Sequence, residues 1–198
     1  DVEGYDACRK IAILTSLAYG KQLDFEDIYT EGITKITDRD IKYAAKLKAK
    51  VKIFGSSKLA GDKVSAMVAP KLITHDHPLY SVDGVFNAIL VKGNMVGDVM
   101  FYGQGAGKLA TASAVVSDIV DEVKHLNRNI MTMWDQDKVE LLPISDTSKR
   151  FFVRIKGEPQ AMKAHLESKF GPIEIVQVEP LEGEFGFLTE IMTEGHFE

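Results

Sequence analysis

Apolar residues recur at helical spacing near the start of the chain. Four of them are separated by four, three and four positions, and they are Ala7, Ile11, Leu14 and Ala18. This spacing places them on one face of a helix, so the sequence predicts a helix over residues 6–19 that stops at Gly20. The sequence Thr-Asp-Arg-Asp from residue 37 resembles an N-terminal cap and predicts a second helix over residues 37–48.

The period then changes to that of β-strands. Four runs rich in β-forming residues are separated by Gly, Pro, Asn and Asp, and they cover residues 51–55, 63–73, 84–92 and 95–103. Gly93 and Asn94 tolerate a positive φ, so residues 92–95 are predicted to form a tight hairpin turn. Four consecutive strands favour a mixed or antiparallel sheet with helices packed on one face. Helical spacing returns over residues 111–126.

The C-terminal part repeats the change from strand to helix. Residues 136–149 are polar and predict a linker between a first domain, residues 1–135, and a small module, residues 150–198. The module is expected to contain a strand, a helix and two further strands, at residues 151–155, 159–170, 173–178 and 185–193. The whole chain is therefore expected to be an α+β protein. A module this small is marginal for independent folding, so it is expected to pack against another chain or to lack its last elements.

Composition narrows the function classes. The chain has 198 residues, 24 basic and 29 acidic side chains, and a net charge of −5, with 45% hydrophobic residues. No apolar run in it approaches the length of about 20 residues that a membrane span needs. An acidic chain without a basic block argues against nucleic-acid binding. Cys8 is the single cysteine, so no internal disulfide can form, and we expect a soluble protein of a reducing compartment such as the cytoplasm.

The densest candidate chemistry lies in the first ten residues, D-V-E-G-Y-D-A-C-R-K. Gly4 permits a sharp entry into the first helix, where an acidic side chain is stabilised by the helix dipole. Asp6 and Lys10 are one helical turn apart, so a carboxylate can hold an ammonium group ready for proton transfer. The same spacing also fits an ordinary surface ion pair, because such pairs are common on helices.

A second candidate is the glycine-rich sequence F-Y-G-Q-G-A-G at residues 101–107, which lies between a strand and a helix. Such a turn presents backbone N–H groups that suit a phosphate or a closely approaching cofactor. Its spacing is neither that of a dinucleotide fingerprint nor that of a P-loop, so a purely structural turn stays open. The histidines and Cys8 show no metal-ligand spacing, and no metal site is expected.

These motifs resemble the homoserine dehydrogenase family. The first ten residues match the end of the family signature, D-[hydrophobic]-x-G-x-D-x-x-x-K, at every fixed position. Further segments resemble the family in the same order over about residues 1–128. They are Y-T-E-G-I from residue 29, H-P-L from residue 77, G-V-F-N-A from residue 84, and the glycine-rich turn followed by T-A-S from residue 111.

The resemblance implies an oxidoreductase that interconverts L-aspartate 4-semialdehyde and L-homoserine by NAD(P)-dependent hydride transfer. This reaction lies on the route to threonine, methionine and isoleucine. Family members carry an N-terminal Rossmann domain, so we expect this chain to be the substrate-binding, catalytic and dimerisation domain, with NADP or NAD bound mainly by the part that precedes it. The same resemblance implies a homodimer or higher homo-oligomer.

The resemblance also assigns roles to residues. Lys10 corresponds to the lysine that hydrogen-bonds the reacting oxygen and acts in proton transfer, and Asp1 to the aspartate beside the substrate hydroxyl. Asp6 corresponds to the aspartate that supports this network. Gly103 and Gly105 resemble the segment that approaches the cofactor. These roles agree with the chemistry, because hydride delivered to an aldehyde leaves an alkoxide that needs a positively charged donor.

The tail resembles a divergent, shortened ACT domain. Gln160 stands where ACT domains that bind amino acids commonly have glycine, so we expect the tail to serve mainly in packing or assembly rather than in threonine binding. Two other functions remain open: a non-catalytic regulatory or assembly module with an inert acid–lysine pair, and a related semialdehyde or hydroxy-acid dehydrogenase. A fragment without a nucleotide domain is expected to be inactive alone.

Overall fold

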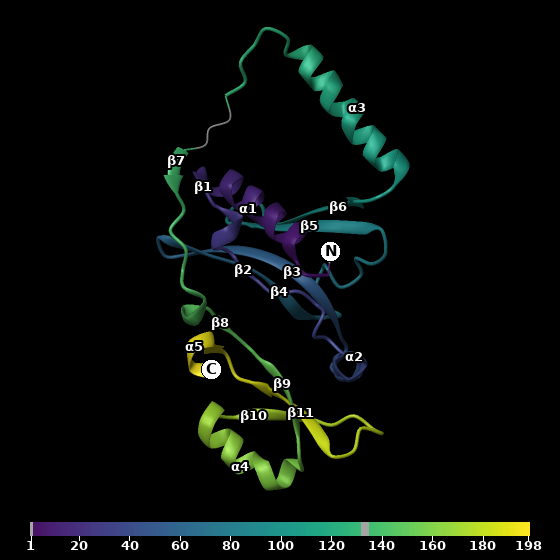
Figure 1. The fold of residues 1–198 in the computed structure, drawn as a ribbon, viewed down its shortest axis with the longest axis vertical. Helices are drawn as coiled ribbons and strands as arrows, with labels where there is room; N and C mark the ends of the chain where they lie inside the picture. Colours follow the sequence, from purple (N-terminus) through teal and green to yellow (C-terminus); the bar gives the residue numbers. More distant parts are fainter. Residues whose placement is uncertain (1, 132–134) are drawn as a thin grey trace. The chain divides into compact units, whose positions relative to one another are not determined.

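The computed structural model describes residues 2–131 and 135–198 of the chain (Figure 1). Contacts divide it into a larger unit, Asp1–Leu72 with Trp134–Glu198, and a smaller unit, Ile73–Met133. The domain boundaries expected near residues 135 and 150 remain predictions, since this division reflects contacts alone.

The first part of the larger unit consists of two helices and a mixed sheet. Its elements are α1 (Tyr5–Tyr19), β1 (Lys21–Gln22), η1 (Phe25–Asp27), β2 (Tyr29–Thr30), α2 (Asp38–Lys46), β3 (Ala49–Ala60) and β4 (Lys63–Thr74). The sheet order is β2-β4-β3, and β2 runs parallel to β4. A two-residue turn joins β3 to β4, so these neighbouring strands are antiparallel. The α+β class and the mixed sheet expected from the sequence are confirmed.

Helix α1 packs on this sheet through small side chains. Its buried residues are Cys8, Ala12, Thr15 and Ser16, and of these Cys8 and Ala12 form one core with Val64 and Val68 of β4. The predicted helix bounds are confirmed, but the expected apolar face is rotated, because Ala18 is exposed. Small residues let the helix approach closely: a Cβ on Gly55 of β3 would lie 3.3 Å from the Cβ of Ile11.

The rest of the larger unit begins with the segment that the sequence predicts to be a linker. It contains β7 (Asp135–Lys138), η2 (Ile144–Asp146) and β8 (Ser148–Lys149). Strand β7 pairs in parallel with β1, and backbone bonds join Val64 to Glu140 and Leu142. The segment is thus hydrogen-bonded to the first part of the unit over much of its length.

The C-terminal module has the strand–helix–strand–strand order that the sequence predicts. Its elements are β9 (Phe152–Lys156), α4 (Pro159–Phe170), β10 (Ile173–Val176) and β11 (Glu184–Thr189), followed by β12 (Met192–Thr193) and α5 (Glu194–Phe197). The sheet order is β10-β11-β9 with antiparallel pairs, and Leu166, Phe185 and Phe187 form its buried core. The strand expected over residues 185–193 is interrupted, because β12 pairs with β8 instead.

The smaller unit contains a hairpin and a long helix. Strands β5 (Phe86–Gly93) and β6 (Gly97–Gln104) pair in register from Phe86–Gln104 to Gly93–Gly97, and α3 covers Lys108–Lys124. Within the described residues they form a separate two-stranded sheet rather than an extension of β3 and β4. The hairpin is confirmed, but its turn is shifted toward the C-terminus of the predicted one. Residues 94–96 connect the strands, and the positive φ expected at Gly93 or Asn94 is found at Gly97, at 77°. Helix α3 starts three residues earlier than predicted, because Gly107 is its N-cap.

Candidate active site

A sharp turn places the first candidate residues at the start of α1. Gly4 has φ 83°, in the left-handed region that glycine favours, and its carbonyl accepts the N–H of Cys8 at 2.8 Å. A Cβ at this position would lie 3.2 Å from side-chain atoms of Thr30, Ile53 and Val68. The turn therefore lies directly against the sheet, and glycine is the residue that fits there.

Asp6 and Lys10 meet one helical turn later, as the spacing predicts. The Lys10 Nζ lies 2.7 Å from the Asp6 Oδ2. Both side chains are open to solvent, with 65% of Lys10 and 58% of Asp6 exposed. The structure thus brings these two site residues together, whereas Asp1 lies outside the described residues. This geometry can supply a proton from an accessible ammonium group held by a carboxylate, and it is also the geometry of a surface ion pair.

A loop to which the sequence assigned no role contacts the same turn. The N–H of Ile33 donates to the Val2 carbonyl at 2.8 Å. A Cβ on Gly32 would lie 2.2 Å from that carbonyl oxygen and 2.5 Å from the Glu3 Cα. No side chain fits in such a space, so Gly32 allows the loop to support the turn before α1. The signal in the sequence is the segment Y-T-E-G-I, whose glycine interrupts an otherwise bulky run.

Glycines of the second candidate lie in the smaller unit and have different surroundings. A Cβ on Gly103 would have no atom within 4 Å, whereas a Cβ on Gly105 would lie 1.9 Å from the Nδ2 of Asn87. The N–H of Gly105 also donates to the Val85 carbonyl at 3.0 Å. Gly105 therefore has a structural reason to be glycine. Gly107, with φ 126°, begins α3 without a side-chain cap.

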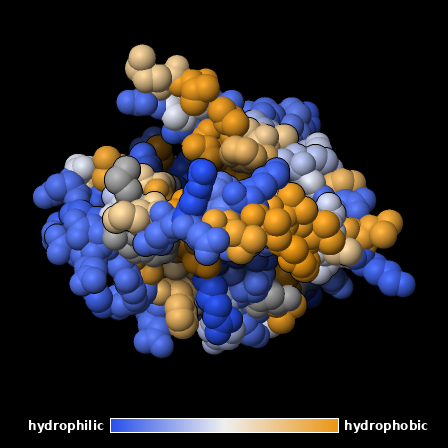
Figure 2. Space-filling view, turned by 90° about the horizontal axis from the view of Figure 1, so that it is seen from above, coloured by the Kyte–Doolittle hydropathy of each residue, from blue (hydrophilic) through white to orange (hydrophobic). Residues whose placement is uncertain are grey.

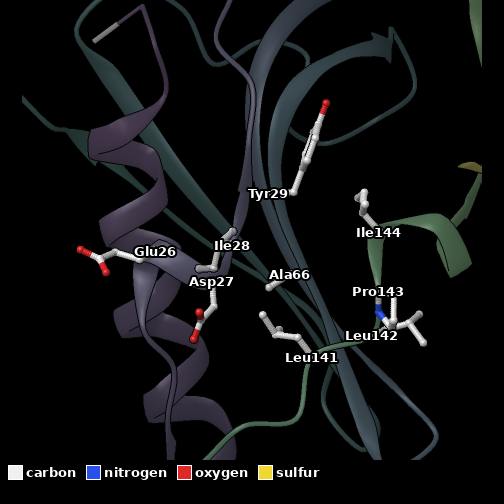
Figure 3. A pocket seen from close by; sticks show the side chains of 9 residues that line it. All are labelled: Glu26, Asp27, Ile28, Tyr29, Ala66, Leu141, Leu142, Pro143 and Ile144. Carbon is white, nitrogen blue, oxygen red and sulfur yellow. The ribbon is translucent and has the colours of Figure 1, made fainter.

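A hollow of about 350 Å³ lies in the larger unit, apart from the predicted residues (Figure 3). Its lining is mostly apolar and comes from residues 26–29, Ala66 and residues 141–144. In Figure 3 the Glu26 side chain points away from Ala66 and Leu141. Because no candidate site residue lines this hollow, we assign it no role in the chemistry.

Lys71 on β4 is a perturbed titratable group that the sequence analysis missed. Burial, with a smaller contribution from the charge of Lys149, lowers the pKa of Lys71 to about 8. Its Nζ donates to the Ser56 hydroxyl at 2.8 Å and lies 5.1 Å from the centre of the Phe54 ring. The signal in the sequence is a lysine within the apolar strand A-M-V-A-P-K-L-I.

Two further observations concern the part of the chain that the structure describes. None of its helices is both long and apolar enough to cross a membrane. No group of three or more His, Cys, Asp or Glu side chains converges there in a way that could hold a metal ion.

Comparisons with known proteins point to one family. The family model of homoserine dehydrogenase matches residues 1–120. A homoserine dehydrogenase of Neisseria gonorrhoeae is 38% identical over 168 residues, which cover 81% of this chain and 39% of that protein. One from Bacillus subtilis is 43% identical over 130 residues, covering 66% of this chain and 30% of that protein.

Solved structures are similar to this chain over a longer part of its length. A homoserine dehydrogenase from Thiobacillus denitrificans superposes with a TM-score of 0.85 at 30% identity, covering 100% of this chain and 48% of that one. The homoserine dehydrogenase from S. aureus, solved at pH 6.5, gives a TM-score of 0.74 at 31% identity and covers 98% of this chain and 48% of that one. The similarity therefore includes the C-terminal module, and the chain spans less than half the length of these relatives.

Proposed function

Because the chain belongs to the homoserine dehydrogenase family, we propose that it is the substrate-binding and catalytic part of an enzyme that interconverts L-aspartate 4-semialdehyde and L-homoserine. The observation that carries this proposal is the Asp6–Lys10 pair, 2.7 Å apart, at the position of the family motif. An exposed ion pair of this kind contributes only about 0.2–0.5 kcal/mol to an isolated helix, so stability alone is a weak reason for it.

Lys10 has the chemistry that the reaction needs. When the aldehyde carbon accepts a hydride, negative charge develops on its oxygen, and an ammonium group supplies both opposite charge and a proton. In the reverse direction the amine accepts the proton of the homoserine hydroxyl. Asp6 holds the ammonium group in place, and Asp1, for which we propose contact with the substrate hydroxyl, completes the set.

For the cofactor we propose NADP or NAD, which supplies the hydride when bound. Gly103 and Gly105 are the proposed contacts from this chain. Two observations favour such an approach: there is open space beside Gly103, and the backbone N–H groups at the start of the 17-residue helix α3 have no side-chain cap. We propose that most of the nucleotide site belongs to a preceding domain of the same protein.

We also propose that the protein is a homodimer or a higher homo-oligomer. Apolar side chains gather at the surface among polar ones (Figure 2). The smaller unit carries many exposed apolar side chains: Ile89, Val91, Met100 and Phe101 of the hairpin, and Val115, Val116, Ile119, Val120 and Val123 of α3. Exposed apolar area of this kind favours contact with another domain or another subunit.

For the C-terminal module we propose an ACT-like packing role. The turn that departs from the ACT pattern is held by the chain itself, since the Gly157 N–H donates to the Gly183 carbonyl at 2.9 Å. The Met162 sulfur would lie 2.5 Å from a Cβ on Gly157. This side chain fills space beside the turn, which supports packing rather than amino-acid binding there.

Activity of the gene product that contains this chain tests the proposal. We expect it to reduce NAD(P)⁺ with L-homoserine and to oxidise NAD(P)H with aspartate semialdehyde, whereas residues 1–198 alone should do neither. A panel of other hydroxy acids and semialdehydes separates this enzyme from a related dehydrogenase. Absence of turnover with every substrate would favour the non-catalytic assembly module and reject the proposal.

A further inference from the structure

Four charged side chains join the C-terminal module to the start of α2. The Arg154 Nε donates to the Asp40 Oδ1 at 2.9 Å, and its Nη1 donates to the Glu184 Oε2 at 3.3 Å. The Arg39 Nη1 donates to the same Glu184 oxygen at 2.5 Å. The Glu184 side chain is only 3% exposed. Such a buried carboxylate is costly without its cationic partners, so the two arginines favour one arrangement of the module against α2.

Aromatic packing next to these ion pairs restricts the same contact. Tyr43 of α2 is fully buried, and its ring centre lies 5.4 Å from that of Phe152 on β9. A Cβ on Gly186 of β11 would lie 2.6 Å from the Phe152 ring and 3.0 Å from the Tyr43 ring. Because β11 and α2 approach so closely, moving one along the other would make their atoms collide. Figure 1 shows α2 beside β9 and β11 in the larger unit.

The bonds continue from Asp40 toward the turn before α1. The other oxygen of Asp40, Oδ2, accepts the Thr37 N–H at 2.8 Å and the Thr37 hydroxyl at 2.6 Å. One residue earlier, the Ile36 N–H donates to the Ile33 carbonyl at 3.0 Å. Ile33 in turn donates to the Val2 carbonyl, two residues before Gly4. Short hydrogen-bonded steps therefore connect Arg154 of the module with the turn that positions Asp6 and Lys10.

We propose that Arg154 is a positioning residue for substrate binding. It holds Asp40 and with it the N-terminus of α2, so that residues 32–36 support the turn that carries the catalytic motif. The proposal rests on the function proposed above, and it makes the C-terminal module part of the substrate site's support. Displacement of catalytic groups by about 1 Å can cost up to about 100-fold in rate, so a distant support of this kind has a measurable effect.

The test compares two conservative substitutions in the gene product that contains this chain. Arg154→Lys keeps the positive charge but cannot bond Asp40 and Glu184 in the same way, because lysine lacks the planar fork. Arg150→Lys is the matched control, because Arg150 precedes β9, pairs with Glu174 at 3.3 Å and donates to the Thr189 carbonyl at 2.9 Å, all inside the module. We expect Arg154→Lys to lower kcat/KM for homoserine about tenfold, because a shifted turn displaces Lys10 from the reacting oxygen. The KM for NAD(P)⁺ should change little, and Arg150→Lys should change neither kcat/KM for homoserine nor the KM for NAD(P)⁺. Arg154→Lys should also lower the melting temperature, because the buried Glu184 carboxylate loses part of its bonding, so both variants are assayed at a temperature at which they are fully folded.

A double substitution checks the route. If Arg154 acts through Asp40, then Arg154→Lys combined with Asp40→Asn should lower kcat/KM for homoserine no more than the larger single change, since both break the same bond. An unchanged kcat/KM for homoserine in Arg154→Lys, or a loss of rate that only follows the loss of folded protein, would show that the contact is structural and overturn the positioning role. If the unsubstituted protein does not oxidise homoserine, the proposed function is wrong, and that failure is seen before any variant is compared.

Discussion

Gly103 and Gly105 stand two residues apart in one turn, yet substitution should affect them in different ways. An added methyl group at Gly103 meets nothing within 4 Å, whereas at Gly105 it would collide with Asn87. Gly103→Ala should therefore fold normally. If the cofactor approaches this backbone, the substitution should raise the KM for NAD(P)⁺ several-fold, where each fivefold change corresponds to about 1 kcal/mol of binding free energy. Gly105→Ala should instead lower the melting temperature. A Gly103→Ala enzyme with wild-type cofactor kinetics would remove Gly103 from the proposed contacts.

Lys71 gives a prediction about stability and pH. Its pKa is about 8 in the folded chain against 10.5 in the unfolded chain, so between these values the unfolded chain binds more protons. Stability should then rise with pH from about 8 to about 10.5, and the full cost of the buried charge should be present below pH 8.

Lys71→Met removes this charge and keeps the length of the side chain. We expect it to increase the free energy of unfolding at pH 7 by about 1–2 kcal/mol, a figure that already allows for the lost hydrogen bond to Ser56. The dependence of this free energy on pH should also become flatter above pH 8. Urea unfolding at pH 7 and pH 9.5 measures both effects. Lys58→Met is the matched control, because Lys58 is exposed on β3. Equal pH profiles for the wild type and Lys71→Met would contradict the assignment.

At the scale of single elements, α2 depends on its first turn. Burial raises the pKa of the Asp40 carboxyl, but the hydrogen bonds from Thr37 and Arg154 outweigh it and hold that pKa below its ordinary value of 3.8. A carboxyl with a lowered folded pKa contributes stability that is present above pH 3.8 and is lost as the pH falls through the folded value.

Asp40→Asn should therefore lower the urea midpoint clearly at pH 7 and less at pH 3, with a cost of about 1–2 kcal/mol at neutral pH. Asp38→Asn provides the control, since Asp38 is exposed in the same first turn of α2. A loss of stability in Asp40→Asn that is equal at both pH values would mean that the charge of Asp40 makes no contribution.

The elements that the sequence predicted best are those with a local signal. The cap at Thr37 and the helix that starts at Pro159 depend on neighbouring residues, and both are found where the spacing places them. The rotated face of α1 and the pairing of β7 with β1 depend on partners far along the chain. Small core residues such as Ala12 and Ser16 carry little hydrophobic signal, so period alone could not identify them.

In the candidate site, too, the local contacts were predictable from the sequence and the long-range contacts were not. Asp6 and Lys10 meet because one helical turn separates them, which spacing alone predicts. The support from Gly32 and the ion pairs of Arg154 join residues that are far apart in sequence, and no local pattern indicates them. Their roles follow from contacts that exist only in the folded chain.

At the scale of the whole molecule, the chain combines the proposed catalytic motif, the sheet beside it and a C-terminal module within one compact unit. The glycine turn and the exposed apolar face of α3 belong to the other unit. On our account the nucleotide-binding part of the protein is needed for turnover, and Lys10 then decides how fast hydride transfer proceeds.

Steady-state kinetics of Lys10→Ala in the complete gene product test this account most directly. Lys163→Ala is the control, because Lys163 forms a similar surface pair with Glu167 at 3.8 Å on α4. We expect Lys10→Ala to reduce kcat for homoserine oxidation by about 100- to 10,000-fold with a nearly unchanged KM for NAD(P)⁺, and Lys163→Ala to behave as the wild type. A folded Lys10→Ala enzyme that turns over homoserine at the wild-type rate would contradict the account.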